Sequence, residues 1–202
     1  MNGDASVSEL VRMMGSQIQS FADSLDSEEV EQFLGEICAS RRIYVTGMGR
    51  SGLVARAFAM RLMHVGLEVF VIGETVTPAL KKGDTLVIFS GSGETRTVAE
   101  FAEAAKRLGG RLCLVTAERN SRIGRVADCI VEIESQRRED ESTQFEVRQI
   151  TGKHKSLALP FAPLGTLFET EALVFADAVI SAIMILKECE PDVLSRRRAN
   201  IE

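Results

Sequence analysis

Five short apolar runs, separated by helix-like stretches, constrain the fold of this 202-residue chain more than any other feature. Apolar residues recur at helical spacing over Ser51–Val65, Thr95–Leu108 and the shorter stretch Ser121–Ala127. Short apolar strands that alternate with helices are typical of a parallel sheet covered on both faces. We therefore predict an α/β fold with right-handed crossovers. Its five strands are Ile43–Thr46, Glu68–Ile72, Thr85–Phe89, Arg111–Val115 and Cys129–Ile133.

Helices are also predicted on either side of the sheet. Residues 5–39 show helical periodicity, and Ser27 is the expected cap of the second of two helices there. A long helix begins near Thr166 and is apolar nearly all round, which indicates burial on several sides, with another subunit as the expected second neighbour. We predict a single domain with an N-terminal helical arm (1–41), a sheet core (42–133), a charged connection (134–160), and a C-terminal helix and tail (161–202).

Composition argues against several classes of function. The net charge is −5, and the chain has no Trp and one Tyr, so neither a basic surface nor aromatic stacking favours a nucleic-acid partner. The four cysteines are scattered and form no C-x-x-C pair, so no metal site is predicted. The most apolar stretch, Leu173–Leu186, is interrupted by Asp177 and is too short for a membrane span. No secretory signal is recognised at the N-terminus, and the cytoplasm is the expected location.

Two glycine-rich loops follow predicted strands, at the sheet edge where open α/β folds bind ligands. The first is TGMGRSG at 46–52 and the second is SGSGET at 90–95. Backbone amides and the following helix N-terminus suit an anion such as phosphate. An N-cap role could explain Ser51 and Thr95, but a cap explains one hydroxyl per helix and the second loop has three. The candidate phosphate-binding residues are Gly49, Arg50, Ser51, Ser90, Gly91, Ser92, Gly93 and Thr95, and Thr75 after the second strand is a further pocket candidate.

A dinucleotide is the alternative ligand for the first loop, because GMGRSG matches the G-x-G-x-x-G pattern. That pattern requires an acidic residue about 20 residues further on, to bind the ribose. Glu74 lies 27 residues after Gly47, which is late. A dinucleotide site also leaves the second loop unexplained, so one compact phosphorylated ligand is favoured.

Several motifs in register resemble the 6-phospho-3-hexuloisomerases of the sugar-isomerase (SIS) superfamily. They are GMGRSG at 47–52, AMRLMH at 59–64, IGETVTP at 72–78, SGSGET at 90–95 and PLGTLFETEAL at 163–173. The resemblance implies a five-stranded sheet in the flavodoxin-like order and a tetramer. It also implies interconversion of 3-hexulose 6-phosphate and fructose 6-phosphate. In two respects the chain departs from the family: residues 134–160 form a longer segment, and Arg198 stands where the family has a tail histidine.

The resemblance also implies the catalytic residues. Carbonyl transfer between neighbouring carbons through a cis-enediol needs one base and neither metal nor redox cofactor, and Glu169 matches the family's catalytic glutamate. Thr166 and Glu169 also fit a capping box, which is the structural alternative. His64 is the second candidate, for ring opening on the fructose side. It lies about 20 Å along a helix from Ser51, so the resemblance implies that it acts in a neighbouring subunit's site.

Arg50 could contact the phosphate, polarise the carbonyl, or form a structural salt bridge. Two other functions stay open beside the hexulose isomerase. One is a non-catalytic sugar-phosphate sensor on the same fold, and the other is an aldose–ketose isomerase of pentose phosphates.

Overall fold

The computed structural model describes residues 6–133 and 166–188. All five predicted strands are present, each within about one residue of its predicted ends. The short helix predicted at Ser121–Ala127 is reduced to one 3-10 turn, η1. The charged connection at 134–160 and the tail containing Arg198 lie outside the described residues. The elements are α1 (Val7–Ser24), α2 (Ser27–Ala39), β1 (Ile43–Gly47), α3 (Arg50–His64), β2 (Val69–Val71), β3 (Thr85–Phe89), α4 (Arg96–Arg107), β4 (Arg111–Thr116), η1 (Gly124–Val126), β5 (Cys129–Glu132) and α6 (Thr166–Leu186).

The strands form one parallel sheet in the order β2-β1-β3-β4-β5, which confirms the predicted flavodoxin-like order. The order reverses at β1, because β2 lies on one side of it and β3 on the other. The loops after β1 and β3 therefore emerge side by side at the carboxyl edge. In open α/β sheets such a reversal is where ligands bind.

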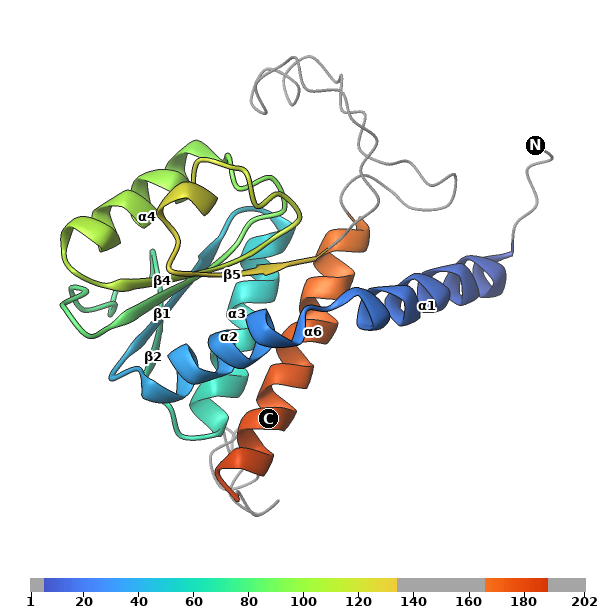
Figure 1. Cartoon of the computed structure of the whole chain (residues 1–202), viewed down its shortest axis with the longest axis horizontal. Helices are drawn as coiled ribbons and strands as arrows, with labels where there is room; N and C mark the ends of the chain where they lie inside the picture. Colours follow the sequence, from blue (N-terminus) through green and yellow to red (C-terminus); the bar gives the residue numbers. More distant parts are fainter. Residues whose placement is uncertain (1–5, 134–165, 189–202) are drawn as a thin grey trace.

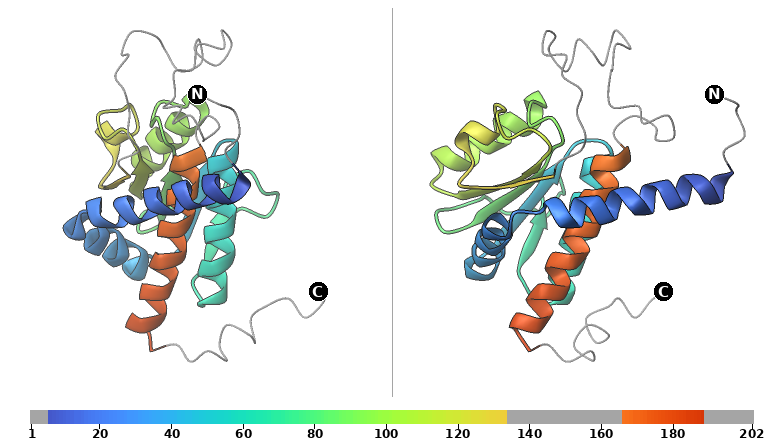
Figure 2. Two further views of the ribbon diagram at one scale, coloured as in Figure 1. Left: turned by 90° about the vertical axis from the view of Figure 1, so that its right-hand side faces the viewer. Right: turned by 45° about the vertical axis from the view of Figure 1, so that its right-hand side comes forward.

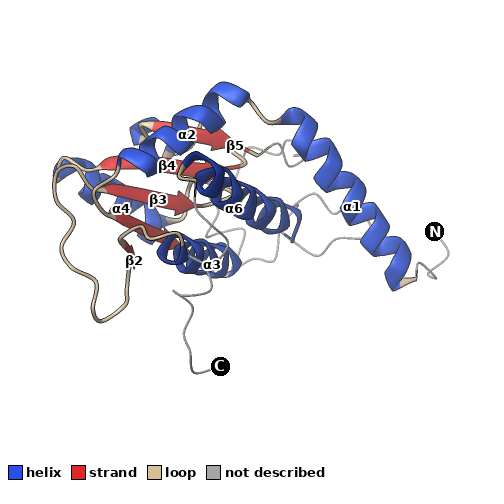
Figure 3. Ribbon diagram, turned by 90° about the horizontal axis from the view of Figure 1, so that it is seen from below, coloured by secondary structure: helices blue, strands red, loops and turns tan. Residues whose placement is uncertain are grey.

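Helices cover both faces of the sheet (Figures 1 and 3). One face packs on α2, α3 and α6, with a core that includes Phe33, Phe58 and Phe175. The other face packs on α4, whose alanines at 99, 102 and 105 allow close approach to Leu86 and Leu112. This explains why the interior strands β1, β3 and β4 are mostly apolar: both of their faces are buried.

The N-terminal helix α1 extends away from the body of the molecule (Figures 1 and 2). Of its residues only Phe21 is buried. The prediction that Ser27 caps α2 is wrong by one residue. Asp26 is the N-cap, and its carboxylate accepts hydrogen bonds from the amides of Glu28 and Glu29. No helix in the described parts of the chain is both long enough and apolar enough to cross a membrane.

Candidate functional site

Three segments that are distant in sequence meet at the carboxyl edge of the sheet. They are the first glycine loop (47–52), the second glycine loop (90–95) and the first turn of α6. Arg50 Nε donates a hydrogen bond to Glu169 Oε2 at 3.3 Å. Phe168 packs on the second loop so closely that a Cβ at Gly91 would lie 3.0 Å from its ring. The structure therefore brings the candidate base to both predicted phosphate loops.

The two helices that follow the glycine loops begin without a side-chain cap. Gly49, at φ +59°, is the N-cap of α3, so Ser51 lies inside the helix and does not cap it. Thr95 is the N-cap of α4, but its side chain makes no cap hydrogen bond. In contrast, α1 and α2 are capped by Ser6 and Asp26. Both helix ends at the site thus keep first-turn amides that no side chain caps, which suits an anion.

The serines of the second loop shape the loop. Ser90 Oγ accepts a hydrogen bond from the Gly93 amide, and Ser92 Oγ accepts one from the Glu94 amide, each at 3.2 Å. A hydroxyl that accepts in this way still has its own proton to donate. The two hydroxyls are therefore held by backbone amides while their protons stay available to a phosphate oxygen.

Glu169 lies in an environment suited to proton transfer. Its side chain is 15% exposed. This partial burial raises the pKa of the carboxyl above its ordinary value, and the hydrogen bond from Arg50 offsets part of the rise. A carboxylate with a raised pKa is a better proton acceptor at neutral pH than an ordinary glutamate. The side chain of Thr166 is outside the described residues, so the capping-box alternative is not tested.

Two other candidates lie apart from this cluster. His64 ends α3, at the opposite end of that helix from Arg50, and is only 6% exposed. Thr75 is exposed in the loop after β2. Neighbouring residues of that loop have structural roles: the Thr77 hydroxyl donates to Val71 O, and Glu74 forms an ion pair with Arg56 of α3. Glu74, which a dinucleotide would need for its ribose, is thus paired with a cation of the protein.

Glu171 is a further titratable group that sequence reasoning did not identify. It is 3% exposed, and no group in the described residues hydrogen-bonds to its Oε2. Burial raises its pKa to about 7. Helical spacing could have predicted its burial. Glu171 comes three residues after Phe168 and four before Phe175, so it shares a helix face with these two buried side chains.

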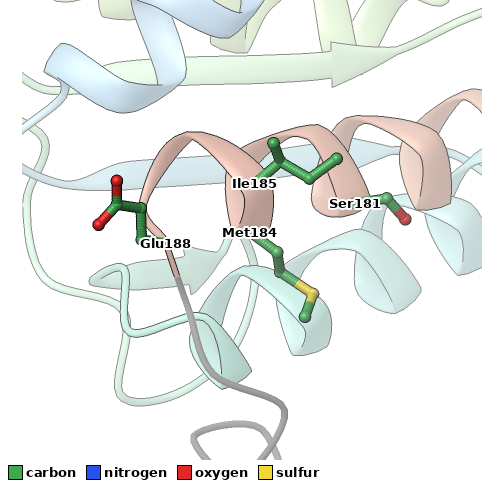
Figure 4. Close-up of a pocket in the computed structure, with 4 residues that line it drawn as sticks. All are labelled: Ser181, Met184, Ile185 and Glu188. Atoms are coloured by element: carbon green, nitrogen blue, oxygen red, sulfur yellow. The ribbon is translucent and has the colours of Figure 1, made fainter.

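Within the described residues, no group of three His, Cys, Asp or Glu side chains is placed to hold a metal ion. A hollow of about 360 Å³ lies at the far end of α6, lined by Ser181, Met184, Ile185 and Glu188 (Figure 4). It is remote from Glu169, which lies in the first turn of the same helix. The hollow is mostly apolar and open, and it contains none of the predicted site residues.

The parallel sheet and the two glycine loops at its carboxyl edge define a class of protein. Comparison with known sequences identifies that class. Residues 36–154 match the sequence model of the SIS domain. The chain belongs to the SIS domain family.

Several relatives have a more specific name. A Bacillus subtilis protein named 3-hexulose-6-phosphate isomerase is 36% identical over 96% of this chain and 98% of its own length. A protein of the same name from Mycobacterium gastri is 36% identical over 94% of this chain and 88% of its own length. A solved structure from Methanococcus jannaschii superposes with a TM-score of 0.76 at 28% identity, over 96% of this chain and 98% of that one. A function of 3-hexulose-6-phosphate isomerase was inferred from that structure.

Proposed function

We propose that this protein is a sugar-phosphate isomerase that interconverts 3-hexulose 6-phosphate and fructose 6-phosphate. The observation that carries the proposal is the half-buried Glu169 carboxylate with a raised pKa, held beside Arg50 and both phosphate loops. The two curated relatives and the solved structure that bear this activity in their names align over nearly the whole chain.

In the proposed reaction, Glu169 removes the proton from C2, next to the C3 carbonyl, and returns it to C3, while the hydroxyl proton on the C2 oxygen passes to the C3 oxygen. The intermediate is a cis-enediol, and one carboxylate can serve both steps because it faces both carbons. Arg50 stabilises the negative charge that develops on the oxygen atoms, since it lies next to the base. The phosphate is bound by the amides and hydroxyls of the two glycine loops.

We also propose that the protein acts as a homo-oligomer, with a tetramer as the assembly implied by the resemblance. Leu53, Met60 and Met63 form an exposed apolar side of α3. On α6, Leu173, Val174 and Ile185 are also exposed. Apolar side chains gathered on two neighbouring helices favour contact with a second copy of the chain. In this assembly His64 supplies the ring-opening acid to a neighbouring subunit's site, for which its buried side chain must turn outward.

An assay on the purified protein tests the reaction. A separate synthase generates 3-hexulose 6-phosphate from ribulose 5-phosphate and formaldehyde, and the appearance of fructose 6-phosphate is followed. We expect fructose 6-phosphate to form only when this protein is added to the synthase mixture. Saturable sugar-phosphate binding without turnover would identify a sensor, and turnover of a pentose phosphate instead would identify the aldose–ketose isomerase.

Mixed oligomers test the role of His64. We expect H64A and E169Q each to lose about 10²-fold or more in turnover as homo-oligomers. When the two variants are co-expressed, sites built from two subunits recover up to about a quarter of wild-type activity, because some sites then combine an intact Glu169 with an intact His64. The control is expression of each variant alone, which should recover nothing. Full activity in H64A, or no recovery on mixing, would leave His64 as an ordinary helix-end residue.

A further inference from the structure

The second glycine loop is bound along one side by residues 116–124, a segment that runs from the last residue of β4 to the first residue of η1. Gly91 O accepts hydrogen bonds from the Ala117 amide at 3.1 Å and from Thr116 Oγ1 at 3.3 Å. Gly93 O accepts one from the Ile123 amide at 3.1 Å. Two carbonyls of the loop are therefore turned toward this segment.

Packing keeps the loop and the segment in close contact. Gly93 has φ +61°, and a Cβ there would lie 2.0 Å from Ser121 Oγ. Ser121 is fully buried and cannot move aside easily. The Glu94 carboxylate accepts a hydrogen bond from the Arg122 amide at 2.6 Å, so this motif residue anchors the loop to the segment. The loop can hold its shape before any ligand arrives.

The position of Gly91 O determines the direction of the next amide. In a trans peptide the N–H points opposite to the carbonyl. With Gly91 O held against Thr116 and Ala117, the Ser92 N–H points away from the 116–124 segment. No group in the described part of the chain accepts a hydrogen bond from it. This amide is free to bind an anion.

We propose that Thr116 is a positioning residue for phosphate binding, which it supports by holding the Gly91–Ser92 peptide so that the Ser92 N–H faces the ligand. The proposal rests on the proposed function, because it takes the second loop to be the phosphate site. Thr116 is the last residue of β4 and is 0% exposed, so its hydroxyl touches no ligand. Its only described partners are Gly91 O, Glu118 O and the Glu118 amide.

The test is T116V, which removes the hydroxyl and keeps the shape of the side chain. We expect KM for the sugar phosphate and Kd for inorganic phosphate to rise about 3- to 10-fold, the effect of one misaligned hydrogen bond. We expect kcat to stay within about twofold, because the amide binds substrate and transition state alike. T116S keeps a hydroxyl and should restore both constants to near the wild-type values.

A matched control comes from the opposite edge of the sheet. Thr85 is a buried threonine at the start of β3, and its hydroxyl is hydrogen-bonded to Ser40. T85V makes the same chemical change and should leave KM and the phosphate Kd unchanged. Unaltered constants in T116V, or equal rises in T85V and T116V, would overturn the proposal. Failure of the wild-type protein to bind any sugar phosphate would instead overturn the proposed function, and this proposal with it.

Discussion

Replacing Glu169 by glutamine is expected to lower kcat for the interconversion of the two hexulose phosphates by about 10²- to 10⁴-fold, the usual contribution of a positioned general base. Glutamine keeps the size of the side chain and can still accept a hydrogen bond from Arg50, but it cannot remove a proton. Binding of the sugar phosphate should persist, because the two glycine loops are unchanged. Steady-state kinetics and calorimetric titration with fructose 6-phosphate measure the two quantities separately.

The same substitution two residues further along the helix gives a matched control. E171Q also replaces a buried carboxyl of α6 by an amide, but Arg50 pairs with Glu169, and the pKa of Glu171 is shifted by burial alone. We expect this variant to keep wild-type kcat. If E169Q retained turnover, or if both variants lost it equally, Glu169 would not be the base.

The pH dependence of kcat provides a second readout of the same assignment. A base must be ionised to act, so activity is lost as the pH falls through the pKa of Glu169. Because burial raises this pKa above the ordinary value for glutamate, the acid limb should lie at a higher pH than for an exposed carboxylate. An acid limb at or below the ordinary glutamate value would contradict the environment described for Glu169.

The strands and their order could be predicted because their signals are local. Each strand is a short, mostly apolar run; the run at Thr85–Phe89 lies between Gly83 and Gly91, and Gly110 directly precedes the run at Arg111–Thr116. The glycine loops could be proposed as phosphate sites from the sequence, because backbone amides at a glycine-rich loop and the following helix N-terminus suit an anion. The cap of α2 was misassigned because Asp26 and Ser27 are both good capping residues, and composition does not choose between neighbours.

The contacts that make the site could not be predicted in this way. Arg50 and Glu169 are separated by 119 residues, and no local pattern indicates which cation a distant carboxylate meets. The contact between Phe168 and Gly91 likewise depends on how α6 packs against the loop. Burial of Glu171 was not predicted because charged side chains are usually exposed. Its position on the helix, between two buried phenylalanines, nevertheless indicated that it is buried.

We expect the pH dependence of the free energy of unfolding to show that Glu171 is buried in its neutral form. Its pKa is about 7 in the folded protein and close to the ordinary glutamate value of 4.5 when unfolded. Between these values the folded state retains a proton that the unfolded state releases, so the free energy of unfolding falls as the pH rises through this window. The loss amounts to about 3 kcal/mol and is complete above the folded pKa. Glutamine is neutral at every pH, so E171Q should match the wild type near pH 5 and exceed its stability by up to about 3 kcal/mol at pH 8.

Urea unfolding of both proteins from pH 5 to 8.5, at one protein concentration, measures this difference. D177N removes an exposed carboxylate from the same helix, and its stability should change with pH as the wild type does. Parallel stability curves for wild type and E171Q would mean that Glu171 is ionised and solvated in the native protein. A difference that grows with pH would mean that the helix carrying the proposed base also buries a neutral acid near its first turn. Such a group would oppose folding above neutral pH while leaving the chemistry at Glu169 unchanged, so stability and activity would have separate pH dependences set by two carboxyls only two residues apart.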